Sequence, residues 1–495
     1  MSEFKQNLIK ARSHIVFLTG LLLSFALVIW LELWEPEETL VHKALHQTKE
    51  PFISVGSDGD KIVIRPIIEA TENRPKPLGS RELTALERKW ARVAWQYFEN
   101  NYQAATGFVN STDYYPSTTL WDLSSYLLGM ISAHRLGIVS DEKFYTRTAK
   151  LLESLASIEL FDGRLPNKVY HTETLAMVNY NNQATEQGIG WSALDIARFL
   201  IPMHTLSRHY PEFTHATQRV VSRWDLESMF SDGQMIGARL ANAEGHSADE
   251  QSVDAERSEQ AEQPVEAIVE LVQEGRLGYE EYAAKASLLE GWDASRAGLY
   301  DDNMKLVSIY GIDVATDARD PKVYDAHNYV VTEPYVLDGI EFGWDAVSAE
   351  LAWRIHEVQR LRYESTGKLT AVSEDNIDRE PHFVYNTIFT GGKAWNTITE
   401  DGNDASEFAT LSTKAAFGLH MLYETEYTHK LISRLHSLNN PERGWYSGIY
   451  EASGETNSII TANTNGIILE TLAFKQFGPL LKYQPNQSLQ VAEFD

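Results

Sequence analysis

The longest apolar run of the chain lies near its N-terminus, from Ile15 to Leu31, and contains no charged residue. With Trp34 at headgroup depth, such a run is typical of a transmembrane helix. Basic residues precede the run and acidic residues follow it, namely Lys5, Lys10, Arg12, Glu32, Glu35, Glu37 and Glu38. Because basic flanks stay in the cytoplasm, we expect 1–14 to be a cytoplasmic tail and 15–34 a single-pass signal anchor in the inner membrane. The soluble body then lies in the periplasm.

A cleavable signal peptide is the alternative to an anchor. No small-x-small cleavage site follows the apolar run before the acidic stretch, which favours the uncleaved anchor.

Further along the chain, apolar residues recur every three or four positions, as in Leu123, Leu127 and Ile131. This spacing is typical of helices with one buried face. The helical patterns cover 83–100, 123–131, 141–157, 194–201, 214–229, 279–289, 347–361, 411–422, 427–438 and 465–477. One β-like stretch, from Leu299 to Ile312, interrupts the series, and no βαβ alternation or short repeat is present. The pattern predicts an all-α body of helical hairpins over 82–482.

Three segments outside this pattern are polar. Residues 35–81 are rich in proline and predict a periplasmic tether with one short strand, from Lys61 to Ile68. Residues 244–266 are acidic and contain few apolar side chains, so we expect a disordered insertion. Residues 483–495 are expected to form a C-terminal tail.

The amino-acid composition excludes several classes of partner and of active site. The chain has 43 Lys plus Arg against 70 Asp plus Glu, and its net charge of −27 argues against nucleic acid as a partner. It has no cysteine, which excludes disulfides, zinc ribbons, iron–sulfur clusters and thiol catalysis. No HExxH, P-loop or dinucleotide motif occurs. We therefore expect no cofactor and no required metal.

Segments that read as loops combine acids, amides, aromatics and glycine. Examples are STTLWDLSSYLLG, YNNQATEQGIGWSALDIAR, TEPYVLDGIEFGWD, GGKAWNTITEDGND and GWYSGIYEASGETN. Sugars require this mixture, because aromatic faces stack on C–H surfaces while carboxylates and amides bind hydroxyls. Hydrolysis of a glycosidic bond also requires two carboxyl groups. For any one acid, however, helix capping is the alternative explanation.

The motifs TTLWDLSSYLLG, TEPYVLDGIEFG, SEDNID, STKAAFG, GWYSGIYE and TANTNGIILE resemble a bacterial family known only as a domain of unknown function. That family is related to the glucoamylase-like domains of (α/α)6-toroid glycosidases, including those of cyclic β-1,2-glucan synthases. The resemblance implies an (α/α)6 toroid with a loop-built cleft at one end, and a setting in envelope polysaccharide metabolism. A polysaccharide synthesis or export complex is then a candidate partner. The resemblance does not supply the catalytic positions.

Our own interpretation of the residues makes Glu341 and Glu374 the acid–base pair of an inverting glycoside hydrolase. Glu341 lies in a Gly-rich segment before a predicted helix, where it could face the barrel mouth. Glu374 is adjacent to Asp375, and in an extended loop the two point opposite ways. The predicted substrate-binding residues are Trp121, Asp122, Glu186, Trp191, Asp338, Asp375, Trp395, Trp445, Glu451 and Asn463.

Two other functions stay open. A non-catalytic polysaccharide-binding or assembly factor would need the same aromatic and acidic loops. A polysaccharide lyase could use His327 with Tyr329, or His382 with Tyr385, although a buried histidine more commonly has a structural role.

Overall fold

The computed structural model describes residues 70–71, 74–75, 78–241, 268–324 and 328–481, together with the backbone of two strands, β1 (Phe52–Val55) and β2 (Ile62–Arg65). These strands pair antiparallel, and β2 confirms the strand expected after Lys61. The predicted anchor at 15–34, the acidic insertion at 244–266 and the tail at 483–495 lie outside the described residues. Within the described residues, no helix is both long and apolar enough to cross a membrane.

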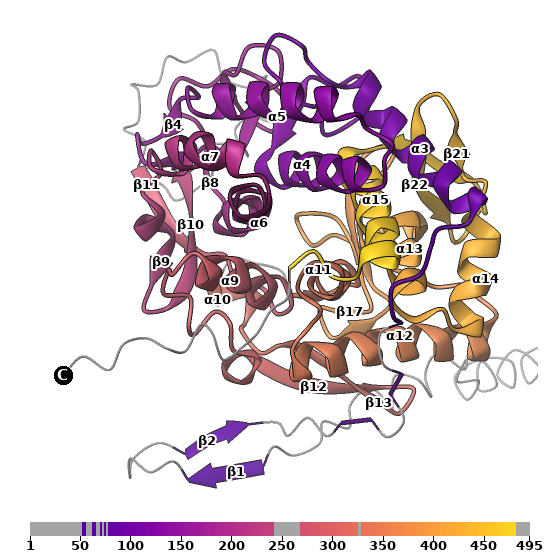
Figure 1. Cartoon of the computed structure of the whole chain (residues 1–495). Helices are drawn as coiled ribbons and strands as arrows, with labels where there is room; N and C mark the ends of the chain where they lie inside the picture. The colour runs from indigo at the N-terminus through magenta and orange to yellow at the C-terminus, as the bar shows by residue number, and fades with distance from the viewer. Residues whose placement is uncertain are drawn as a thin grey trace, which may run out of the picture.

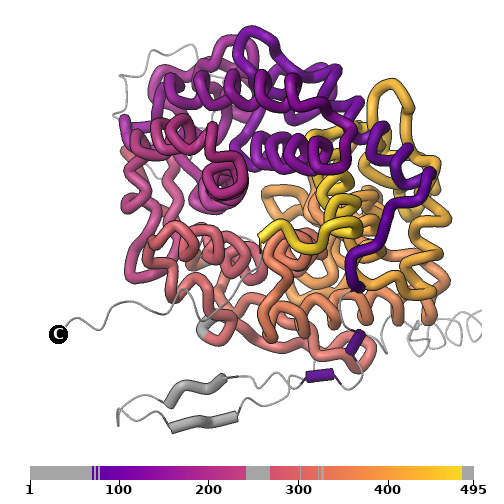
Figure 2. Tube along the Cα trace, viewed as in Figure 1, coloured from indigo at the N-terminus to yellow at the C-terminus, as the bar shows by residue number. Residues whose placement is uncertain are grey.

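Six helices form a closed inner ring. They pack in cyclic order, and α15 closes the ring by packing on α4 (Figures 1 and 2). The six are α4 (Leu120–Arg135), α6 (Ala193–His209), α9 (Tyr279–Leu289), α11 (Glu333–Phe342), α13 (Thr413–Tyr423) and α15 (Ala462–Phe477). Every residue of α11 and α13 is buried, as expected of helices that have neighbours on all sides.

Outer elements precede the inner helices and cover them. Five are helices, namely α3 (Ala85–Asn100), α5 (Asp141–Leu155), α7 (Thr214–Val221), α12 (Ala346–Thr366) and α14 (Glu426–Leu435). The sixth position, before α11, is occupied by the antiparallel hairpin of β12 (Met304–Ile309) and β13 (Ile312–Asp317), which packs on α12. The β-like stretch expected at 299–312 is therefore the first strand of a hairpin that replaces one outer helix. The short helix α10 (Pro321–Tyr324) follows it.

The expectation of an all-α body is too simple, because small sheets surround one end of the ring. The strands that stand just before inner helices are β3 (Ser117–Thr119), β8 (Gly190–Trp191), β14 (Tyr329–Val330), β20 (Thr410–Ser412) and β23 (Thr456–Ile460). They pair with neighbouring loop strands in sheets such as β3-β6-β7, β11-β10-β8, β14-β17-β18 and β20-β22-β21. β15, β16 and β19 form a further sheet.

The remaining strands each lie between an outer helix and the inner helix that follows it. They are β4 (Leu160–Phe161), β5 (Leu165–Pro166), β6 (Val169–His171), β7 (Met177–Val178), β9 (Phe230–Ser231), β10 (Gln234–Ala241), β11 (Ile268–Gln273), β15 (Glu374–Asn376), β16 (Phe383–Asn386), β17 (Phe389–Thr390), β18 (Lys393–Ala394), β19 (Thr397–Ile398), β21 (Asn439–Asn440) and β22 (Gly444–Tyr450). Single 3-10 turns occur at Pro211–Phe213, Leu226–Met229, Tyr300–Asp302 and Ser406–Phe408. The helix expected over 214–229 is thus α7 followed by such a turn.

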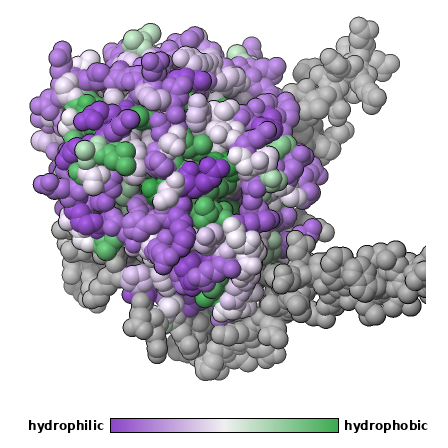
Figure 3. Space-filling model, turned by 90° about the vertical axis from the view of Figure 1, so that its right-hand side faces the viewer, coloured by the Kyte–Doolittle hydropathy of each residue, from purple (hydrophilic) through white to green (hydrophobic). Residues whose placement is uncertain are grey.

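The segment TEPYVLDGIEFGWD, expected as a loop, contains the inner helix α11. This expectation is wrong because α11 is buried on every side and so shows no amphipathic period. Gly343 ends the helix in the left-handed conformation, with φ 77°. On the side of the body shown in Figure 3, hydrophilic residues cover most of the surface and hydrophobic residues show only in small patches.

The closure of the ring depends on a small residue at the contact between α4 and α15. A Cβ atom added to Gly466 would lie 2.6 Å from the backbone oxygen of Ser125, closer than packing allows. We predict that Gly466→Ala forces the two helices apart and lowers the free energy of unfolding by about 1–3 kcal/mol. Thermal unfolding measures this effect. Gly79→Ala, where nothing lies within 4 Å, is the control. Equal melting temperatures for the two variants would contradict a tight helix contact.

Candidate active site

The first turns of the six inner helices meet at one end of the ring. In a toroid of helical hairpins all inner helices run the same way, so their N-terminal ends gather together. Each first turn places a polar or aromatic side chain there, namely Trp121 and Asp122 from α4, Asp195 from α6, Tyr279 from α9, Glu333 from α11, Lys414 from α13 and Asn463 from α15. Helix N-termini favour negative charge, which suits the carboxylates among these residues.

Glu333 is the centre of this group. It is buried and forms an ion pair with Lys414. Asn463 donates from Nδ2 to Glu333 Oε1 at 3.0 Å, and Trp121 donates from Nε1 to the same oxygen at 3.1 Å. Burial alone would raise the pKa of Glu333, but Lys414 and Arg198 outweigh it and hold the pKa below its usual value. The carboxylate is therefore ionised, and it joins four inner helices.

Glu374, at the start of β15, is partly exposed beside this centre. Tyr279 donates a hydrogen bond from its hydroxyl to Glu374 Oε1. Burial and the neighbouring charge of Glu333 raise the pKa of Glu374 to about 7. The next residue, Asp375, is buried and accepts a hydrogen bond from Ser412 Oγ at 3.0 Å. Burial raises the pKa of Asp375 well above its usual value. Of the two neighbours, Glu374 is the exposed one and can hold a proton near neutral pH.

Two further carboxyls at this end are partly exposed. The Asp122 carboxylate accepts a hydrogen bond from Thr119 Oγ1 at 2.9 Å, and Thr119, the N-cap of α4, accepts one from the backbone N–H of Asp122 at 3.2 Å. Burial raises the pKa of Asp122, while Arg198 and Lys414 oppose that rise. Burial and the nearby Glu274 raise the pKa of Asp195 to about 7. Asp122 therefore has cationic neighbours that favour its ionised form, whereas Asp195 has anionic ones.

Glu341 does not lie beside Glu374. It is eight residues after Glu333 on α11, which corresponds to about 12 Å along the helix axis. Only 1% of Glu341 is exposed, and Tyr282 donates from its hydroxyl to Glu341 Oε2 at 2.7 Å. Burial raises its pKa to about 7, and its carboxyl neighbour is Glu470 of α15. The expected pair of Glu341 and Glu374 is therefore not assembled, and the carboxylate that accompanies Glu374 is Glu333.

Arg198 of α6 lies between the first turns of the inner helices and the acids deeper in the barrel. It is fully buried, donates to Ser125 Oγ at 3.0 Å and lies 3.8 Å from Glu470. Its guanidinium also stacks on the ring of Trp121, 4.3 Å from the ring centroid. One cation thus supports the aromatic side chain at the mouth and balances the acids below it.

Asp338, a predicted sugar ligand, is buried on α11. Lys285 donates to both of its oxygens, at 2.7 and 2.6 Å. This ion pair links α9 to α11 inside the barrel, so Asp338 has a structural role.

The tryptophans predicted to stack on sugar differ in their surroundings. Trp191 and Trp445 have no exposed surface, and their Nε1 atoms donate to the backbone oxygens of Ile236 and Trp90 at 3.0 and 3.1 Å. A fully buried ring offers no face to a ligand, so these two are packing residues. Trp121 is partly exposed at the ring of first turns.

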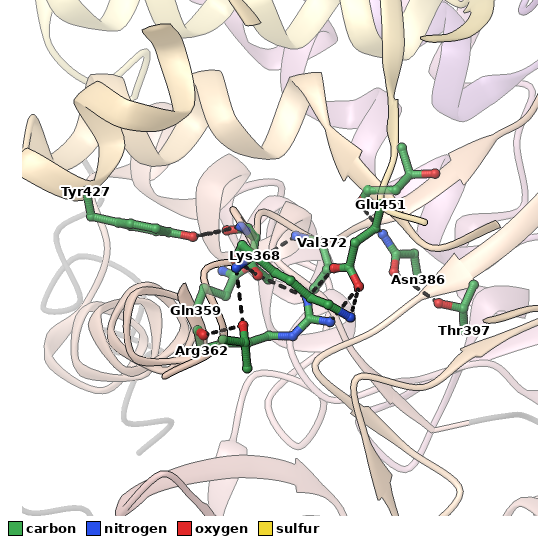
Figure 4. Close-up of polar contacts among 11 residues, drawn as sticks. Gln359, Arg362, Lys368, Val372, Asn386, Thr397, Tyr427 and Glu451 are labelled. Carbon is green, nitrogen blue, oxygen red and sulfur yellow. Dashed lines mark hydrogen bonds and ion pairs between the residues drawn. The ribbon is translucent and has the colours of Figure 1, made fainter. Parts of the chain in front are cut away.

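Glu451 lies between β22 and the outer helix α12. Arg362 donates to its two oxygens at 2.6 and 2.9 Å, and Lys368 donates at 3.1 Å (Figure 4). Burial would raise the pKa of Glu451, but these cations lower it. Arg362 also lies 4.7 Å from the ring of Trp395, which is partly buried. Glu451 and Trp395 therefore belong to an ion-paired contact of α12, and no described contact joins them to Glu333.

Glu186 is exposed on the loop between β7 and β8, where it lines a separate pocket. The sequence interpretation did not select Asp195, Tyr279, Lys414 or Glu333 as site residues. One signal could have found Glu333, because it stands directly before Pro334, and proline in the first turn marks a helix start.

The described residues contain no group of three or more acidic or histidine side chains arranged to hold a metal ion. The residues considered for a lyase are also dispersed. Tyr329 and Tyr385 stack on one another with ring centroids 4.3 Å apart, while the exposed His382 contacts Glu380. His327 lies outside the described residues.

The sequence and the fold of this chain can both be compared with those of known proteins. The family model described as "Protein of unknown function (DUF3131)" matches residues 89–478. The chain belongs to this family. No curated protein sequence matches it.

Solved structures similar to this DUF3131 protein share its fold. A candidate glucoamylase from Bacteroides fragilis has 14% identity and a TM-score of 0.54, covering 82% of this chain and 94% of its own. An endo-β-1,2-glucanase from Chitinophaga pinensis, in complex with sophorotriose and glucose, has 11% identity and a TM-score of 0.52, covering 81% and 94%. The endo-β-1,2-glucanase of Talaromyces funiculosus with sophorose has 9% identity and a TM-score of 0.52, covering 80% and 84%. At these identities the likeness shows the glucoamylase-like (α/α)6 toroid.

The ion pair at the centre of the site predicts a pH-dependent defect in this DUF3131 protein. Lys414→Met leaves Glu333 buried without its cation, and such a loss costs about 3–5 kcal/mol of folding free energy. Without Lys414, only Arg198 and the hydrogen bonds to Glu333 still oppose burial, so we expect the pKa of Glu333 to rise above its unfolded value and the folded state to hold the proton more tightly. Stability should then fall as pH rises from the unfolded pKa toward neutrality.

Urea unfolding of Lys414→Met at acidic and neutral pH measures this defect. Lys430→Met is the matched control, because Lys430 pairs with Glu426 in an exposed position on α14. If both variants unfold like the wild type at neutral pH, Glu333 does not depend on Lys414 for its charge.

Proposed function

We propose that this protein is a membrane-anchored glycoside hydrolase that cleaves an exported glucan or related exopolysaccharide. One observation carries the proposal. At the first turns of the inner helices, two neighbouring carboxyls have pKa values shifted in opposite directions, raised to about 7 for Glu374 and lowered for Glu333. A carboxyl whose pKa is raised by burial and by a neighbouring carboxylate is typical of a general acid that works near neutral pH.

In this proposal Glu374 is the general acid. Its carboxyl is partly exposed and keeps a proton near neutral pH, which it can give to the oxygen of the departing sugar. Tyr279, hydrogen-bonded to Glu374, orients that carboxyl. Glu333 does not have to touch the substrate, since its negative charge raises the pKa of its neighbour. It is therefore a positioning residue, together with Lys414.

The base that activates water must be ionised and accessible. Burial raises the pKa of both Asp122 and Asp195, but Thr119, Arg198 and Lys414 oppose that rise at Asp122, whereas Glu274 adds to it at Asp195. Asp122 is therefore the better candidate of the two. We assign the base to Asp122. Water attack assisted by a separate base would invert the configuration at the anomeric carbon. Product stereochemistry, observed by NMR during hydrolysis, tests this part of the mechanism.

The choice of substrate rests on chemistry and on similarity of fold. A net charge of −27 favours a neutral polymer over an acidic one. Trp121 and Asn463 add an aromatic ring and an amide next to the carboxyls. Two proteins of similar fold are endo-β-1,2-glucanases, one in complex with sophorotriose and glucose and the other with sophorose. We therefore place linear β-1,2-glucan first among the substrates to be tested.

Replacing each acid in turn separates the roles of two carboxyls, Glu374 and Glu341. Glu374→Gln keeps shape and hydrogen bonding but removes the proton, so turnover should fall about 10²–10⁴-fold with glucan binding retained. Since the acid must be protonated, wild-type activity should decline as the pH rises above about 7. Glu341→Gln, inside the barrel, is the comparison and should reduce turnover far less.

New reducing ends and oligosaccharide affinity should be measured on the same preparations. If Glu341→Gln abolishes turnover while Glu374→Gln does not, the assignment of the acid is wrong. If the wild type binds glucans and cleaves none of them, the protein is a polysaccharide-binding or assembly factor instead.

The anchor is proposed from the sequence of residues 1–34. A basic tail before the apolar run and acidic residues after it favour export of everything that follows. A reporter fused after Asp495 should therefore be active in the periplasm, and deletion of 1–34 should release the body from the membrane fraction. A reporter active only in the cytoplasm would contradict this topology.

A further inference from the structure

The paired strands β15 and β16 present one partly exposed face, which carries the carboxyl of Glu374. Side chains alternate between the two faces of a sheet, and residues paired across two strands lie on the same face. Glu374 is paired with Tyr385, and Asn376 is paired with Phe383. All four residues are partly exposed, and we call this surface the β15–β16 face. Two aromatic rings and an amide therefore share one surface with the proposed general acid.

The opposite face of the same two strands is packed against the body. Asp375 and Val384 are buried, and Val384 belongs to a small apolar cluster with Ile377, Ala405 and Tyr450. The strands are therefore held from behind, and the β15–β16 face is formed before any ligand binds. A binding surface that is formed in advance lowers the entropy cost of binding.

The rings of the β15–β16 face continue a row of aromatic side chains that passes Glu374. Tyr279 donates a hydrogen bond to Glu374, and Tyr385 is the strand partner of Glu374. Two rings in the middle of the row, Tyr279 and Tyr329, are buried, whereas the rings at its two ends are partly exposed. Successive ring centroids lie 5.4, 6.4, 4.3 and 5.1 Å apart along the row, which consists of Trp121, Tyr279, Tyr329, Tyr385 and Phe383.

Arg276, just before α9, places hydrogen-bond donors beside this row. Its guanidinium carbon lies 5.6 Å from the ring centroid of Tyr329. The residue is partly exposed, and its Nε is buried without a hydrogen-bond partner among the described residues. Its charge also acts on Glu374, where it opposes the rise in pKa caused by burial and by Glu333. Because a buried N–H without a partner is costly, a ligand oxygen that accepts from Arg276 would be favoured.

We propose that the β15–β16 face, together with Arg276, is a subsite for the sugar units next to the bond that Glu374 protonates. Tyr385 and Phe383 stack on the C–H surfaces of two consecutive units, while Asn376 and Arg276 bind their hydroxyls. The proposal rests on the glycoside hydrolase function proposed above and deepens it. It gives the direction in which the bound polysaccharide runs from Glu374, which is along β16 toward Phe383.

Binding of long linear β-1,2-glucan to the full-length chain tests this subsite. The variants are made in the Glu374→Gln background, where cleavage is slow and Arg276 has no titrating acid to affect. Phe383→Ala and Arg276→Met should each raise the Kd by about five- to tenfold, as expected for the loss of one aromatic or hydrogen-bonding contact. Phe383→Leu, which keeps an apolar side chain without a ring, carries the same test if Phe383→Ala does not fold.

Phe477→Ala is the matched control, since Phe477 is 37% exposed at the C-terminal end of α15, away from the first turns. Its Kd should equal that of the background. Phe383→Tyr retains an aromatic ring and should recover most of the affinity lost in Phe383→Ala. Failure of Phe383→Tyr to recover it would overturn the stacking role of this position.

The outcomes separate this proposal from the hydrolase proposal. If Phe383→Ala and Phe383→Leu bind the glucan as tightly as their background, the subsite is overturned, while the hydrolase proposal still rests on the turnover of Glu374→Gln. If Phe383→Ala weakens binding but the wild type cleaves no glucan, the subsite is supported and the hydrolase is overturned. A wild type that binds no glucan overturns both.

Discussion

The buried ion pair of Glu333 and Lys414 is the constraint on which the site depends. Removing a carboxylate and an ammonium from water costs free energy that only close pairing and further hydrogen bonds can offset. Here Asn463 and Trp121 supply those hydrogen bonds, and each comes from a different inner helix. Four helices must therefore begin at matching heights, or the carboxylate would remain buried without its partners.

The ion pair also affects the protonation of the carboxyls beside it. Burial and the fixed negative charge of Glu333 both make a charge on Glu374 unfavourable, and together they raise the pKa of Glu374 to about 7. Lower in the barrel, burial raises the pKa of both Glu470 and Glu341, and the charge of Arg198 opposes that rise without cancelling it. Lys414 and Arg198 thus each interact with more than one buried acid of the barrel.

The sequence predicted those helices in which apolar residues recur every three or four positions along one buried face. Outer helices such as α3 and α14 have one buried face, and the expected ranges agree with them. The inner helix α11 was missed because it is buried on all sides, and the sheets near the first turns were missed because their strands are short. The resemblance to toroid glycosidases supplied the closed ring, which local periodicity does not encode.

Candidate site residues were harder to predict, since a site joins residues that are distant in sequence. Glu374, Asp122, Trp121 and Asn463 were chosen from acidic and aromatic motifs and do lie near one another. Glu341 was chosen from the same type of motif, but it lies further along α11 than Glu333 and is therefore deeper in the barrel. Trp191 and Trp445 share the motif chemistry as well, and only their burial reveals that they pack the core.

The closure of the ring by α15 has a consequence for biosynthesis. Ser125 of α4 donates to Asn463 of α15, a contact between residues 338 positions apart. The face of α4 that α15 covers remains without its partner until nearly all of the domain has been made. Contacts this distant in sequence slow folding, because the chain must lose much of its entropy before they form. A chain shortened before α15 would therefore leave that face of α4 uncovered.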